Sequence, residues 1–168
     1  MSSVFERTSV RDYLPTPITK EEEKSLLHAA MSAPSAWNAR PWHFIVIDDK
    51  EKLSAIPEVH PYAHMVKKAP FAILVCGEES SNEKANPFFQ QNCAAATENI
   101  LIHATELGLG SVWVGIYPEE DKVEAIRKLF NIPETIIPFS LIPVGHPKGV
   151  ERKTKDRYDS SKTHRNQW

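Results

Sequence analysis

The chain has 168 residues, of which 41% are hydrophobic and 25% charged, a balance typical of folded globular proteins that excludes wholesale disorder. The longest uninterrupted apolar run, residues 71–76, is far shorter than the roughly 20 residues that a membrane-spanning helix needs, so we expect no membrane association. The net charge of −2 argues against general nucleic-acid binding. The first residues contain no apolar secretory core, so we expect a cytoplasmic protein.

Basic residues gather at the C-terminal end of the chain. Residues 147–168 hold seven Lys or Arg and three acids, whereas residues 1–146 carry an excess of six acids. This pattern indicates either a solvated terminus or cations assembled for a particular anion, and composition leaves both open.

The N-terminal half begins with a charged segment to Pro17 that we expect to be irregular. Thr19 and Glu22 form a capping-box pattern that predicts the start of a helix, and Pro34 ends that helix. Apolar runs and their flanking turn residues predict four further elements: a strand at 43–47, short helices at 50–55 and 63–68, and a buried strand at 71–76.

The C-terminal half begins with the strongest helix, at 87–107, whose apolar residues recur every three or four positions until Gly108. A strand at 111–116 follows, and then a helix that Pro118 opens and Asn131 stops. The last expected strand is 136–144, where Pro138 and Pro143 disfavour a fully paired central position. The sequence therefore predicts a mixed α and β fold, which we expect to be a single domain over residues 1–168.

Familiar catalytic motifs are absent from the sequence, which has no P-loop, Gly-x-Gly-x-x-Gly, Gly-x-Ser-x-Gly or His-Glu-x-x-His pattern. The histidines lack metal-ligand spacing, and Cys76 and Cys93 are expected to be buried hydrophobic residues rather than a disulfide or zinc site. We therefore nominate no catalytic side chain and no metal ligand. If the protein is an enzyme, a bound cofactor would carry the difficult chemistry.

Three stretches could bind such a cofactor. Residues 7–11, Arg-Thr-Ser-Val-Arg, alternate cationic and hydroxyl side chains that can surround a phosphate, although arginines near a terminus are usually just solvated. Residues 33–44 form a loop rich in proline and tryptophan that could hold a flat heterocycle, or whose tryptophans could simply fill the core. Residues 107–117 contain Gly115 inside an apolar strand, where glycine suits the close approach of another group.

Taken together, these stretches resemble the nitroreductase family of FMN-dependent oxidoreductases. The resemblance covers essentially the whole chain and is carried by four patterns in the family's order: Arg-x-Ser-x-Arg at 7–11, Pro-Ser-x-x-Asn-x-x-Pro-Trp at 34–42, Gly-Leu-Gly-Ser-x-Trp-x-Gly at 108–115, and the basic tail. It implies an α+β fold with a mixed sheet flanked by helices, and a homodimer in which the C-terminal tail extends onto the partner subunit.

The resemblance also implies which residues bind FMN. One subunit would hold the phosphate and ribityl end through a group of polar side chains: Arg7, Thr8, Ser9, Lys155 and Arg157. Arg11 would lie near flavin N1 and the C2 carbonyl, where a positive charge stabilises the reduced form. The segment Trp113, Val114 and Gly115 would lie near flavin N5, and the other subunit would contribute Pro34, Ser35 and Asn38.

The function implied is hydride transfer from NAD(P)H through flavin N5 to a small acceptor such as a nitroaromatic or a quinone. Two alternatives keep the flavin: a specialised relative, such as a dehalogenase or a heterocycle dehydrogenase, and a flavin-sequestering protein with little turnover. A structural domain whose basic tail binds an acidic partner is a third alternative, but it leaves the coincidence of the four patterns unexplained.

Overall fold

The computed structural model describes residues 3–149 and 156–168. Its sheet has the order β1-β2-β5-β3, with β4 also paired to β5; the strands are β1 (Trp42–Ile47), β2 (Phe71–Glu78), β3 (Gly110–Ser111), β4 (Val114–Gly115) and β5 (Ile136–Gly145). All of these pairings are antiparallel. A single isolated parallel bridge among the described residues joins Ser9 to Ser111, and it alone makes the arrangement mixed.

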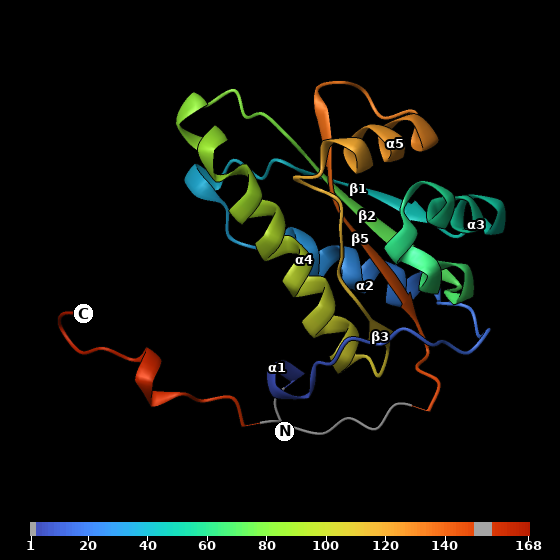
Figure 1. Cartoon of the computed structure of the whole chain (residues 1–168), viewed down its shortest axis with the longest axis horizontal. Helices are drawn as coiled ribbons and strands as arrows, with labels where there is room; N and C mark the ends of the chain where they lie inside the picture. Colours follow the sequence, from blue (N-terminus) through green and yellow to red (C-terminus); the bar gives the residue numbers. More distant parts are fainter. Residues whose placement is uncertain (1–2, 150–155) are drawn as a thin grey trace.

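Helices cover both faces of the sheet (Figure 1). One face carries α2 (Lys20–Met31) and α4 (Phe89–Glu106), and the other carries α3 (Lys50–Val59), the 3₁₀ segment η2 (Pro61–Lys68) and α5 (Glu120–Phe130). Successive side chains of a strand point to opposite faces, so β2 divides its residues between two cores. Phe71, Ile73 and Val75 pack with α2 and α4, whereas Ala72, Leu74 and Cys76 pack with α3 and α5. The α+β fold is confirmed.

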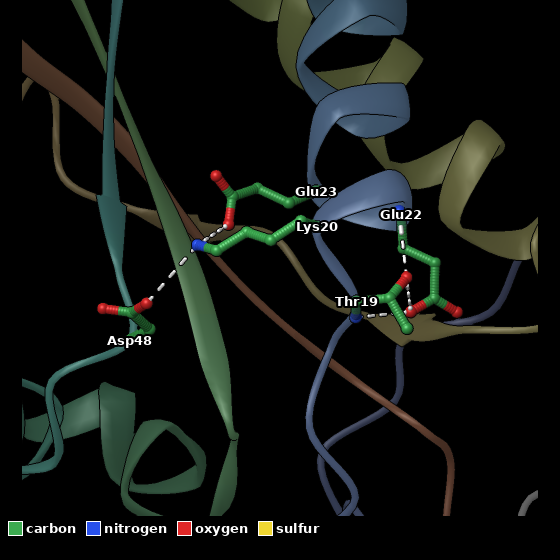
Figure 2. A network of polar contacts seen from close by, with 5 residues as sticks. All are labelled: Thr19, Lys20, Glu22, Glu23 and Asp48. Carbon is green, nitrogen blue, oxygen red and sulfur yellow. Dashed lines mark hydrogen bonds and ion pairs between the residues drawn. The ribbon is translucent and has the colours of Figure 1, made fainter.

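The capping box that predicts the start of α2 is present (Figure 2). The Thr19 hydroxyl accepts a hydrogen bond from the backbone N–H of Glu22 at 3.1 Å, and the Glu22 carboxylate accepts one from the backbone N–H of Thr19 at 2.8 Å. The next residue, Lys20, pairs with Glu23 at 2.8 Å and reaches Asp48, at the end of β1, at 3.8 Å. The capping box defines the start of α2, whereas its position beside the sheet rests on the packing of the buried Leu26 and Ala30.

Several boundaries differ from the sequence prediction. The N-terminal segment contains a one-turn helix, α1 (Ser3–Glu6), and α3 continues four residues beyond the expected end at 55. The helix expected from Pro87 begins at Phe89, because the preceding turn is the 3₁₀ segment η3 (Glu83–Phe88). Two more short 3₁₀ turns were not expected: η1 (Ala36–Asn38) and η4 (Ser160–Lys162). Short 3₁₀ turns have no hydrophobic periodicity from which the sequence could predict them.

The strand expected at 111–116 is divided into β3 and β4, which share one register against β5. Ser111 pairs with Val144 and Val114 pairs with Leu141, so the interruption falls opposite Pro143. Proline has no N–H to donate to the ladder, which accounts for the break. The other proline, Pro138, borders a bulge in the pairing with β2. β5 is thus a central strand, but its prolines occupy incompletely paired positions, as expected.

Both cysteines are completely buried and free, as expected. Burial raises the pKa of the Cys76 and Cys93 thiols to about 12. In the part of the chain that the structure describes, no helix is both long enough and apolar enough to cross a membrane.

Candidate active site

The N-terminal segment lies along the edge of the sheet, beside β3. The backbone N–H of Val10 donates to the carbonyl of Ser111 at 2.9 Å, and the Val10 side chain packs where a Cβ on Gly110 would come within 2.6 Å of it. The buried Tyr13 hydroxyl donates to the Val10 carbonyl at 2.6 Å, and burial raises the pKa of this phenol. These contacts hold Val10 inward and leave Ser9 and Arg11 exposed on either side of it.

One cavity, of about 360 Å³, brings the two ends of the chain together. Arg7, Thr8 and Arg157 line it, together with Val4, Phe5, Asp156 and Tyr158. The Arg7 guanidinium is oriented by Glu98 of α4, whose carboxylate lies 3.3 Å from Nε. Two arginines and a hydroxyl group facing one cavity suit a phosphate, which accepts charge-assisted hydrogen bonds from each of them. Lys155 lies outside the described residues.

A second cavity, of about 250 Å³, is lined by four of the residues that the sequence singled out: Arg11, Trp113, Val114 and Gly115. A Cβ placed on Gly115 would meet nothing within 4 Å, so open space lies directly against the backbone there. A flat ligand can therefore approach this strand closely, with the exposed Arg11 guanidinium lining the same cavity. Ser9 lines neither this cavity nor the one between Arg7 and Arg157.

The loop after α2, residues 34–40, has an unusual backbone conformation that hydrogen bonds to side chains stabilise. Trp37, Asn38 and Arg40 all have positive φ angles, of 52°, 54° and 48°. The Ser35 hydroxyl accepts a hydrogen bond from the Arg40 N–H at 3.0 Å, and the side-chain oxygen of Asn92 on α4 accepts one from the Ala36 N–H at 3.0 Å. Left-handed backbone is costly for residues other than glycine, so these bonds help to keep the loop in one conformation.

Within one chain, this loop is not part of either cavity. The cavities lined by Arg7 and by Arg11 include none of Pro34, Ser35 and Asn38. The two tryptophans of the loop region also differ: Trp42 is buried in the core, whereas Trp37 is 59% exposed and packs against Phe88. The core-filling interpretation thus holds for Trp42 and is wrong for Trp37.

The chain is similar to a known protein family and to individual proteins. The model of the nitroreductase family matches residues 4–64 and 57–146 of the chain. The chain belongs to the nitroreductase family. A protein of Methanothermobacter thermautotrophicus, provisionally named an NADH dehydrogenase/NAD(P)H nitroreductase, is 49% identical over 168 residues, which cover all of this chain and 87% of that protein.

Solved structures share the fold closely. A protein of Clostridium acetobutylicum, provisionally described as an NADH oxidase, is 39% identical with a TM-score of 0.95, and the match covers 99% of this chain and 100% of that one. An FMN-dependent nitroreductase of Clostridium difficile is 28% identical with a TM-score of 0.90, and the match covers 99% of each chain.

The sequence did not single out several residues that line the cavity beside Gly115. These are His60, Tyr62, Met65, Val112, Glu119 and Lys122. Lys122 is only 7% exposed, pairs with Glu119, and places its ammonium group 5.2 Å from the centre of the Tyr62 ring. Lysine is rarely buried, so its burial here marks an unusual position. The sequence alone could not reveal it, because the helical periodicity of α5 does not show which other element Lys122 faces.

Proposed function

We propose that this chain is an FMN-dependent oxidoreductase that uses NAD(P)H. The observation that carries the proposal is that Arg7 and Arg157, 150 positions apart in the sequence, line the same cavity. Two arginines and Thr8 are the donors that a dianionic phosphate requires. The names of the related proteins, which include NAD(P)H nitroreductase and FMN-dependent nitroreductase, support the same assignment.

The cavity beside Gly115 fits the ring of the cofactor. The space left by the missing Cβ admits a flat ring against the backbone, and Arg11 supplies a positive charge in the same cavity. When FMN is bound, its ring supplies the hydride chemistry, taking a hydride from NAD(P)H and passing it to an acceptor. Arg11 would stabilise the negative charge that the ring gains on reduction, and the Gly115 backbone would form the wall against which the ring lies.

We propose a small planar acceptor, such as a nitroaromatic or a quinone. Trp113 borders the cavity and is 36% exposed, so it offers an aromatic edge near the ring site. Aromatic groups pack favourably in offset or edge-to-face arrangements, which suits an acceptor of this class.

We further propose that the functional unit is a homodimer, because the loop carrying Pro34, Ser35 and Asn38 is separate from both cavities of its own chain. The loop contacts α4 near its N-terminal end, through Asn92, whereas Arg7 contacts α4 further along, through Glu98. If α4 packed against its own copy across a twofold axis perpendicular to the helix, the two helices would run antiparallel. The loop of one chain would then approach the Arg7 region of the other.

The absorption spectrum tests the proposal. The protein reconstituted with FMN and freed of excess cofactor should retain the near-ultraviolet and blue bands of a bound flavin. Anaerobic titration with NADH and with NADPH should then bleach the blue band, and addition of a quinone should restore it. A protein that takes up no FMN would overturn the proposal, whereas one that binds FMN but is bleached by neither nicotinamide would be a sequestering protein.

A further inference from the structure

His60 is buried between two elements and reaches across to the strand at the candidate ring site. Its side chain is 2% exposed, and its backbone N–H donates to the Ile56 carbonyl at 2.9 Å at the end of α3. Its carbonyl accepts a hydrogen bond from Ala63 at 2.9 Å at the start of η2. Because both backbone groups are bonded, the imidazole projects from a fixed point.

The imidazole makes one short hydrogen bond, from Nε2 to the Gly115 carbonyl oxygen at 2.7 Å. A carbonyl oxygen can only accept, so Nε2 must carry the proton. Nδ1 is buried and has no hydrogen-bond partner among the residues that the structure describes. A buried ring with one unpaired nitrogen is costly compared with an apolar side chain of similar size. Compared with an apolar side chain, the favourable contribution of the imidazole at this position is its hydrogen bond to the Gly115 carbonyl.

This bond completes the support of a single peptide group. The Gly115 carbonyl is held by His60, and the N–H at the other end of the same peptide, that of Ile116, donates to the Phe139 carbonyl at 3.1 Å. Glycine has the greatest backbone freedom of any residue, so the peptide that follows Gly115 is the one most in need of an external constraint. With both ends bonded, the Gly115–Ile116 peptide has a defined orientation at the edge of the cavity.

We infer that His60 is a positioning residue for the flavin cavity: it holds the Gly115–Ile116 peptide in one orientation and keeps the Gly115 carbonyl oxygen bonded. The inference rests on the proposed function, because the importance of this peptide lies in its place against the ring. A carbonyl oxygen released from His60 could turn its negative end toward a ring that gains negative charge on reduction. Dipoles held in place beforehand avoid that penalty.

Replacing His60 with glutamine and with leucine separates the hydrogen bond from the packing. The amide nitrogen of glutamine lies near the place of Nε2 and can donate, whereas leucine fills a similar volume and cannot. His60→Leu should weaken FMN binding about tenfold, the effect of losing one buried hydrogen bond, and should shift the flavin midpoint potential to more negative values. His60→Gln should remain close to the unsubstituted protein in both measurements.

The dissociation constant is measured by quenching of FMN fluorescence, and the potential by anaerobic dye equilibration. The matched control is His43→Leu, since His43 is an exposed histidine that does not line this cavity. Thermal unfolding of the FMN-free variants reports on folding alone. If His60→Leu does not fold, His60→Asn replaces it, because the shorter asparagine places its amide near Nδ1 and cannot reach Gly115.

The outcomes are distinguishable. If the unsubstituted protein fails to bind FMN, the proposed function is wrong. If the unsubstituted protein binds FMN and a folded His60→Leu or His60→Asn variant matches it in affinity and potential, the proposed function stands and the positioning role is overturned. A His60→Gln variant as defective as His60→Leu would also overturn the inference, because the donated hydrogen bond would then not be the feature that matters.

Discussion

Arg157 shows what one residue can contribute from a segment that is otherwise solvated. Residues 156–168 of the tail are all exposed, yet Arg157 lines the cavity that Arg7 and Thr8 form at the other end of the chain. A cation brought to an anion site from a distant segment can close it once the anion is in place. This arrangement supports the view that Arg157, unlike Lys162 of the same tail, serves an anion as well as being solvated.

We predict that Arg157→Ala weakens FMN binding by about tenfold to a hundredfold, the usual effect of losing a charge-assisted hydrogen bond. Riboflavin has the same ring without the phosphate, so its affinity should change little. The matched control is Lys162→Ala, since Lys162 lies in the same tail and pairs with Asp159 instead. Fluorescence titration at moderate salt measures both ligands. Unchanged FMN affinity, or an equal loss for riboflavin, would show that Arg157 does not contact the phosphate.

The two cysteines provide a second prediction at the scale of the residue. Burial raises the pKa of both thiols to about 12, so the reactive thiolate is scarce at pH 8. In the native protein we expect neither cysteine to react rapidly with Ellman's reagent at this pH. In denaturant, both thiols of the chain should titrate. Rapid labelling of the folded protein would contradict the burial of Cys76 and Cys93.

At the scale of the element, the capping box of α2 is the clearest local contribution to stability (Figure 2). We predict that Thr19→Ala lowers the free energy of unfolding by about 1 kcal/mol. The N–H of Glu22 loses its acceptor, and the Glu22 carboxylate loses the hydroxyl donor while keeping the bond from the backbone N–H of residue 19. Denaturant titration measures this change, with Thr16→Ala, at an exposed threonine outside the helix, as control. FMN affinity should not change, because neither cavity includes α2. A loss of affinity would indicate that α2 influences the site.

Elements were predictable where their pattern is local. The uninterrupted apolar run of β2 and the Thr19–Glu22 spacing are both patterns of neighbouring residues, so the sequence was sufficient to predict both elements. The loop at 34–40 shows the limit. Its left-handed residues, Trp37, Asn38 and Arg40, depend on the Ser35 hydroxyl and on Asn92, which lies more than fifty positions away. No short-range pattern carries that information.

The same contrast applies to the candidate site. The motif containing Arg7 and the one containing Gly115 were both identified from sequence, because cationic, hydroxyl and glycine residues stand out in their segments. His60 was missed because a lone histidine has no distinctive spacing, and its bond to Gly115 spans 55 positions. A residue that acts through another residue's backbone leaves no motif of its own.

At the scale of the whole molecule, the arrangement along α4 indicates how a complete site would be assembled. α4 has 18 residues, about 27 Å at the usual rise, with the loop anchored near its start and the N-terminal segment bound toward its end, where Ser3 donates to Glu106 at 2.9 Å. Ala94 and Ala95 between them are only partly buried within one chain. Small residues there would allow the close approach of a second copy.

Mixed dimers test this assembly directly. In a heterodimer of an Arg7→Ala chain and an Asn38→Ala chain, one site would receive an intact Arg7 from one subunit and an intact Asn38 from the other. We predict that each variant homodimer retains little FMN, whereas heterodimers isolated through two different affinity tags recover about half of the sites, as twofold symmetry requires. Bound flavin is counted by absorbance after removal of excess cofactor.

The matched control is a heterodimer of Arg7→Ala and Arg157→Ala chains. Both arginines line one cavity of the same chain, so each site of this heterodimer keeps one defect and should remain empty. Recovery in the first heterodimer but not in the second would require Asn38 to act across the interface, because no arrangement within a single chain gives that difference. If the first heterodimer recovers no more flavin than the second, Asn38 does not complete the site of a partner chain.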